Sequence, residues 1–207
     1  MLRFEAVVHN TRALRCGRVL DNFPHIIARL ADMIERFTTT LDCVDTTFIA
    51  DGLLDRLPAP AQLGATRVGG VDLNKPRIRA ALAAVLALST TSDGFTVAAF
   101  TAKVHTMTGD TGYTIRQAAY DLRKLRGKQL VTKPGRTHSY HLDPRTAGTI
   151  AALLTLREHV IGPILAGIRS PRRGRKPITW TSVDRDYEKI RIHMQTLFQH
   201  LGIQAAA

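Results

Sequence analysis

Residues 113–140 read YTIRQAAYDLRKLRGKQLVTKPGRTHSY, and they carry the strongest structural pattern in the sequence. At about 100° per residue, its first half separates into an apolar side and a polar side. The apolar side comprises Ile115, Ala118, Ala119, Leu122 and Leu125, and the polar side comprises Arg116, Gln117, Tyr120, Arg123 and Lys124. This pattern predicts an amphipathic helix over 115–126, with one face in a core and the other face basic.

The second half of the same stretch predicts a hairpin. Gly127 can adopt the left-handed conformation that ends a helix. Two short β-like runs follow, residues 129–133 and 138–142, and Pro134-Gly135 joins them. We therefore expect a helix and then a basic two-stranded hairpin over about 131–142.

The composition indicates a globular chain with an anionic partner. The 207 residues are 44% hydrophobic, and 29 Lys and Arg against 17 Asp and Glu give a net charge of +12. This surplus favours nucleic acid over other partners. No apolar run approaches the roughly 18 residues of a membrane span, and the N-terminus lacks the pattern of a signal peptide. We expect a cytoplasmic protein that does not enter the membrane.

Residues 1–57 read as a strand followed by a long helix. Leu2–His9 alternates like a half-buried strand, and a lone strand needs a partner. It pairs with distant sequence or with another subunit, or the chain is the remnant of a longer protein. Apolar residues at three-or-four spacing predict a helix over 23–48, with a possible break at Thr38–Thr40, and a short helix over 50–57.

Residues 58–74 read as a linker rich in Pro and Gly, and residues 75–145 as a second domain. Helices are expected over 75–88 and 96–107, with Thr96 as the N-cap of the second. Together with the helix and hairpin described above, they form a helix-helix-helix-hairpin order. The predicted fold class is mainly α with a small β component.

The motifs of this domain resemble the winged helix-turn-helix domains of MarR-type regulators. The residues that carry the resemblance are F-T-x-x-x-F-x-x-x-V from Phe95, L-x-x-L-x-x-x-x-L-V from Leu122, and S-Y-H-L from Ser139. RFEAVVHNTRALR, VGGVDLNKPRIRA and AAYDLRKLRGKQLV also resemble the C-terminal half of a group of longer uncharacterised bacterial MarR-like proteins. The resemblance implies a winged-helix transcription regulator that binds DNA as a dimer.

A recognition helix and wing predict which side chains contact duplex DNA. Arg116 is suited to guanine, Gln117 to adenine, and Tyr120 to a thymine methyl or a phosphate. Basic side chains on the helix and in the wing are suited to phosphate. The predicted contact residues are Arg116, Gln117, Tyr120, Arg123, Lys124, Lys133, Arg136 and His138.

The C-terminal third reads as two helices joined by a basic segment. Residues 146–169 predict a long helix with a kink at Gly162-Pro163, and 170–181, which include SPRRGRKP, a basic linker. Residues 182–207 predict an amphipathic helix, capped by Ser182, with near-heptad apolar spacing. We expect a homodimer formed through the long helix and the last helix.

Catalysis finds little support in the sequence. There is no phosphate-binding loop or nucleophile-elbow motif, and Cys16 and Cys43 lack the spacing of a zinc or redox pair. We therefore expect neither an enzyme nor a bound cofactor or metal. Two alternatives to a DNA-binding regulator remain open. One is a protein-interaction or assembly module, including a truncated remnant of a longer mobile-element protein, and the other is a winged helix that binds RNA.

Overall fold

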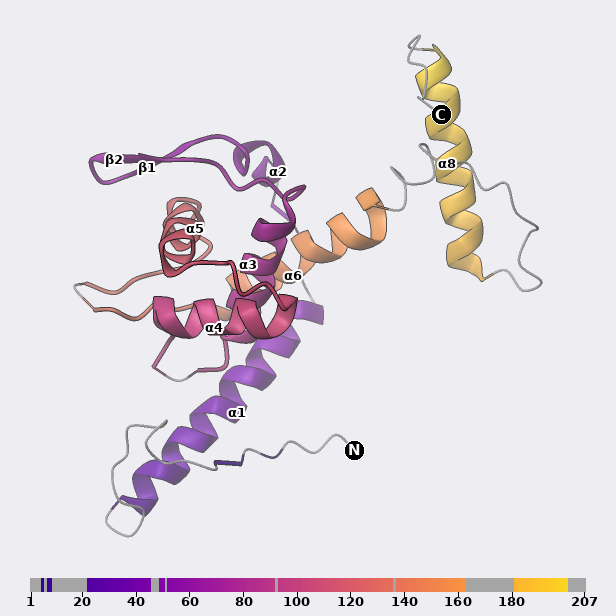
Figure 1. Cartoon of the computed structure of the whole chain (residues 1–207). Helices are drawn as coiled ribbons and strands as arrows, with labels where there is room; N and C mark the ends of the chain where they lie inside the picture. Colours follow the sequence, from indigo (N-terminus) through magenta and orange to yellow (C-terminus); the bar gives the residue numbers. More distant parts are fainter. Residues whose placement is uncertain are drawn as a thin grey trace. The chain divides into compact units, whose positions relative to one another are not determined.

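The computed structural model describes residues 5, 7, 8, 22–45, 49, 50, 52–91, 93–135, 137–162 and 181–200. Across these ranges the protein is mainly helical, with seven α-helices, one π-helical segment and a small two-stranded antiparallel hairpin (Figure 1). The chain divides into two compact units, Met1–Leu154 and Thr155–Ala207. No helix in the described part of the chain is long and apolar enough to cross a membrane.

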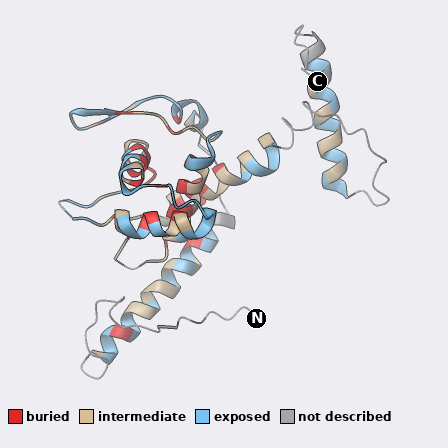
Figure 2. Ribbon diagram, viewed as in Figure 1, coloured by how far each residue is buried: buried red, intermediate tan, exposed pale blue. Residues whose placement is uncertain are grey.

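Three helices form the centre of the first unit. They are α3 (Pro76–Ala87), α4 (Val97–Thr108) and α5 (Ile115–Gly127), which pack against one another. Figure 2 shows their buried faces, to which α6 (Pro144–Thr155) adds a further buried face. The largest fully buried apolar side chains on these four helices are Ile78, Leu82, Val85, Phe100, Leu122, Leu125, Ile150 and Leu153.

The caps of α4 and α5 agree with local sequence rules. Thr96 caps α4, as predicted, because its hydroxyl accepts a hydrogen bond of 3.2 Å from the amide of Ala99. Thr114 and Gln117 form a capping box at the start of α5. The predicted closure of α5 by a left-handed Gly127 is wrong: Gly127 is helical, and Gln129 has the positive φ of 59°.

Three short segments lie side by side at one edge of this helical core. Phe95 and Tyr140 exchange backbone hydrogen bonds of 2.9 and 2.8 Å, and Thr132 and His141 exchange two of 2.9 Å. The residues between α3 and α4 thus pair with the far arm of the loop that follows α5. Of the predicted hairpin over 131–142, the Thr132–His141 bridge is present, and neither arm forms an extended strand.

The two-stranded hairpin lies instead in the segment predicted to be a linker. β1 (Ala61–Leu63) and β2 (Thr66–Val68) pair in register, with Ala61 opposite Val68 and Leu63 opposite Thr66. Gly64, with φ of 60°, is the first of two turn residues, as a tight hairpin of this twist requires. The hairpin packs on α5, so residues 58–74 belong structurally with the helices that follow.

The N-terminal half of the first unit contains α1 (Phe23–Asp45) and α2 (Leu53–Arg56). The possible break at residues 38–40 is absent: the helix is continuous, and the hydroxyl of Thr38 donates to the carbonyl of Glu35 at 2.9 Å. Arg29 forms an ion pair with Asp93. Of the predicted strand over 2–9, only residues 5, 7 and 8 are described, and none is in a strand; the rest lies outside the described residues.

The second unit contains η1 (Leu156–Ile161), a π-helix, and α8 (Ser182–His200). The cap of α8 is Thr181 and not Ser182, because the Thr181 hydroxyl donates to Asp184 at 2.7 Å and accepts from its amide at 3.1 Å. Pro163 of the predicted kink at Gly162-Pro163 lies outside the described residues. The basic residues SPRRGRKP also lie outside them.

Candidate nucleic-acid interface

Helix α5 has a buried side and an open side, and the division differs from the one that the sequence predicts. Arg116 and Arg123 are exposed, as expected. Lys124 is 8% exposed, and Ile115 is 61% exposed, so both assignments to the two sides are wrong. The hairpin β1–β2 packs on one flank of α5, and the residue that follows it, Gly69, lies close to Lys124, which accounts for the burial of Lys124. The residues buried on α5 are Ala118, Asp121, Leu122, Lys124 and Leu125.

A buried carboxylate holds α5 to its neighbours. Asp121 is 0% exposed; it accepts a hydrogen bond of 3.0 Å from the Tyr113 hydroxyl and forms an ion pair of 3.1 Å with Arg77 of α3. Burial raises the pKa of Asp121, against the opposing effect of Arg77 and the Tyr113 hydroxyl. Burial and the charge of Asp121 raise the pKa of Tyr113, which therefore stays protonated. This network fixes the rotation of α5 about its own axis.

Lys124 belongs to the interior of the unit. Its ammonium lies 4.8 Å from the centre of the Tyr120 ring, and its charge favours the ionised form of Asp121. The hairpin backbone passes close by, because a Cβ on Gly69 would lie 3.5 Å from the Lys124 side chain and 3.2 Å from the Tyr120 hydroxyl. Lys124 is therefore placed for packing and charge compensation, and Tyr120, 38% exposed, stands at the border of the open side.

Gln117 has a structural contact that competes with base recognition. Its amide oxygen accepts a hydrogen bond of 2.8 Å from the backbone of Thr114, as part of the capping box. A bidentate contact with adenine needs both the oxygen and the nitrogen of the amide. Gln117 would have to release the cap of its own helix to make that contact.

The loop between Thr132 and His141 carries the other predicted contacts. Lys133 lies 5.4 Å from the centre of the Tyr140 ring, which restrains its stem, and His138 is exposed. Thr137 closes the loop by donating its hydroxyl to the carbonyl of Pro134 at 2.8 Å. Arg136 lies outside the described residues.

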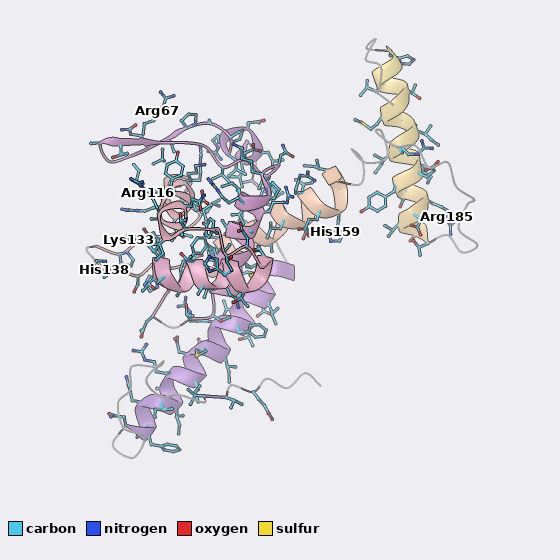
Figure 3. The ribbon with its side chains drawn as sticks, viewed as in Figure 1. Arg67, Arg116, Lys133, His138, His159 and Arg185 are labelled. Carbon is cyan, nitrogen blue, oxygen red and sulfur yellow. The ribbon has the colours of Figure 1, made fainter. Side chains whose placement is uncertain are left out.

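Two arginines outside the predicted contact set are also near the surface of this unit, Arg126 on α5 and Arg67 on β2. Arg126 is half-buried and follows Arg123 by three residues, so both project from one face of the helix. Arg67 is exposed on the outer side of β2, which is the side away from α5 (Figure 3). Helical spacing could have identified Arg126, whereas Arg67 gave no signal because its segment was interpreted as a linker.

Among the residues that the structure describes, no group of three His, Cys, Asp or Glu side chains is placed to hold a metal ion. His105, on α4, has its Nε2 at 2.7 Å from the carbonyl of Tyr113, where it ties α4 to the turn before α5.

Comparisons of the sequence with protein-family models and with curated proteins, and of the fold with solved structures, found no match. The geometry of α5 and its surroundings is thus the basis for assigning a function.

Proposed function

We propose that the protein is a non-enzymatic, duplex-DNA-binding protein of the winged helix-turn-helix type, and that α5 is its recognition helix. The observation that carries this proposal is the open side of α5, where Arg116 and Arg123 are exposed and Arg126 lies beside them. A helix that presents arginines, held rigidly by a buried network on its other side, is suited to the major groove. MarR-type regulation of transcription is the form of this function that the sequence motifs favour.

The order of the elements supports the proposal. From α3 to His141 the chain forms a helix, the bridge residue Phe95, two helices, the bridge residue Thr132, a loop, and the adjacent bridge residues Tyr140 and His141. This order corresponds to a winged helix with α3, α4 and α5 as its three helices and residues 133–139 as its wing. Lys133 and His138 then become candidates for phosphate or minor-groove contacts.

The salt dependence of binding tests the proposed function. With a fluorescein-labelled 30-base-pair duplex of random sequence, fluorescence anisotropy between 50 and 200 mM KCl would give the slope of log affinity against log salt. We expect a slope of roughly −4 to −6, which corresponds to about five to seven neutralised phosphates. Binding that is absent at 50 mM KCl, or a slope near zero, would contradict the proposal.

Competition with RNA separates the two nucleic acids. A-form RNA has a deep and narrow major groove that a helix does not enter. We therefore expect unlabelled duplex DNA to displace the labelled DNA at a lower concentration than a structured RNA of equal length. Preferential displacement by the RNA would favour the alternative of an RNA-binding winged helix.

We also propose that the protein acts as a homodimer, with α8 as its main contact. The first half of the helix predicted for dimerisation is used elsewhere, since Ile150 and Leu153 of α6 are fully buried in the first unit. On α8, Val183, Ile190 and Leu197 are exposed at seven-residue spacing. Ile190→Glu should convert a dimer into a monomer in light scattering, and an unchanged mass would contradict this surface.

A further inference from the structure

The β1–β2 hairpin is anchored at its base. The amide of Val71 donates to the carbonyl of Leu57 at 2.7 Å, and both residues are 1% exposed. The ammonium of Lys128, just after α5, donates to the carbonyl of Arg56 at 2.5 Å. These contacts hold the two ends of the segment that contains the hairpin next to each other and next to the end of α5.

The inner side of the hairpin is fitted to α5. Val68 is 2% exposed, and its pairing partner Ala61 packs against the same part of the helix. A Cβ on Gly127 would lie 2.8 Å from Val68 and 3.2 Å from Ala61. The strands therefore approach the helix so closely that a side chain at position 127 would collide with them. The hairpin is thus held on the flank of α5 that Lys124 and Gly127 form.

The outer side of the hairpin is polar and carries a cation. Gln62 and Arg67 face each other across the two strands, and both are exposed. In Figure 1 the hairpin lies on one side of α5, and the loop between Thr132 and His141 lies on the other. In Figure 3 Arg67, Arg116 and Lys133 lie toward the same side of the view, and the Arg67 side chain projects from the hairpin away from α5.

We propose that β1–β2 is a second nucleic-acid-binding arm, with Arg67 as its phosphate contact and Gln62 beside it. Helix α5 then lies between two arms, and the duplex backbone is held on both sides of the groove that the helix enters. An arginine fork on a hairpin fixed by its own packing loses little freedom when it binds a phosphate. This inference rests on the proposed function, because it assigns a further contact within the same interface.

The test uses the full chain and the labelled 30-base-pair duplex of random sequence. Arg67→Ala should weaken binding by about tenfold at 100 mM KCl and lower the steepness of the salt slope by about one. Arg67→Glu should weaken it further. Lys189→Ala is the matched control, since it removes the same charge from a side chain of α8 that is 72% exposed, and its affinity should stay within about twofold of that of the wild type.

The outcomes separate this inference from the proposed function. If Arg67→Glu binds as the wild type does while Arg123→Ala binds weakly, the second arm is overturned and the recognition helix stands. An equal loss for Arg67→Ala and Lys189→Ala would also overturn the arm, because the effect would then be one of net charge. If the wild type binds no duplex, both ideas fail. On a duplex selected from a random library by the wild type, hydroxyl-radical footprinting should show that Arg67→Ala loses protection at the same place in each half-site.

Discussion

Cationic side chains have different roles on the two sides of α5. On one side, Lys124 and Asp121 are buried, and their charges are balanced by each other, by Arg77 and by the Tyr113 hydroxyl. On the other, Arg116 and Arg123 reach the surface. Charge alone does not mark a contact residue, because the covering hairpin decides which cations remain available to a partner.

The comparison predicts that substitutions on the buried side act on stability and those on the open side act on binding. The largest stability effect is expected for Asp121→Ala, because it leaves the Tyr113 hydroxyl and the Arg77 guanidinium without their shared acceptor. We expect a loss of about 3–5 kcal/mol in the free energy of unfolding. Urea denaturation followed by circular dichroism measures it, and a loss below about 1 kcal/mol would show that the network does not hold α5.

Gly127→Ala tests the packing of the hairpin on the flank of α5. Helix propensity alone would make this change stabilising by about 1 kcal/mol. The added Cβ would lie 2.8 Å from Val68, so we expect a net loss of about 1–2 kcal/mol instead. Hydrogen exchange should accelerate at the β1–β2 amides, and a stabilised protein with unchanged exchange would mean that the hairpin does not pack there.

Asp121→Asn tests the buried carboxyl by its pH dependence. Because the folded-state pKa of Asp121 is raised above its ordinary value of 3.8, the folded protein holds this proton more tightly than the unfolded chain does. The resulting stability is fully present below about pH 3.8 and is lost as the pH rises through the folded pKa. The stability of the wild type relative to Asp121→Asn should therefore decline as the pH rises from 4, measured by urea denaturation. A relative stability that rises with pH would contradict the raised pKa.

Ile115→Ser should have the smallest effect. The sequence pattern places Ile115 in the core, but its side chain is 61% exposed at the start of α5. We expect a change in unfolding free energy within about 0.5 kcal/mol, whereas Leu122→Ala, at a fully buried position, should cost about 2–5 kcal/mol. Equal losses for the two variants would mean that Ile115 is buried in the core, as the apolar pattern predicts.

Local sequence rules predicted most of the helices but not the contacts between distant segments. Periodicity and capping located α1, α3, α4 and α5 to within a few residues, because these signals lie within each helix. The hairpin was missed because its strands have three residues each, too few to show alternation. The burial of Lys124 was missed for the same reason, because the residues that cover it lie more than fifty positions earlier in the chain.

Within the candidate site, Arg116 and Arg123 are as open as predicted, whereas Gln117 caps its own helix. The misassigned positions share a physical cause. A polar side chain that serves a cap or a buried network has the same sequence pattern as one that faces solvent. Only the three-dimensional partners tell the two apart.

The double variant Arg116→Ala/Arg123→Ala tests whether the open side of α5 binds DNA. It should unfold at the same urea concentration as the wild type, because both side chains are exposed. On a duplex selected from a random library by the wild type, each substitution should cost about 1–3 kcal/mol of binding free energy. Anisotropy titration should therefore show affinity reduced by at least about thirtyfold. Undiminished binding by the folded double variant would contradict the assignment of α5 as the recognition helix.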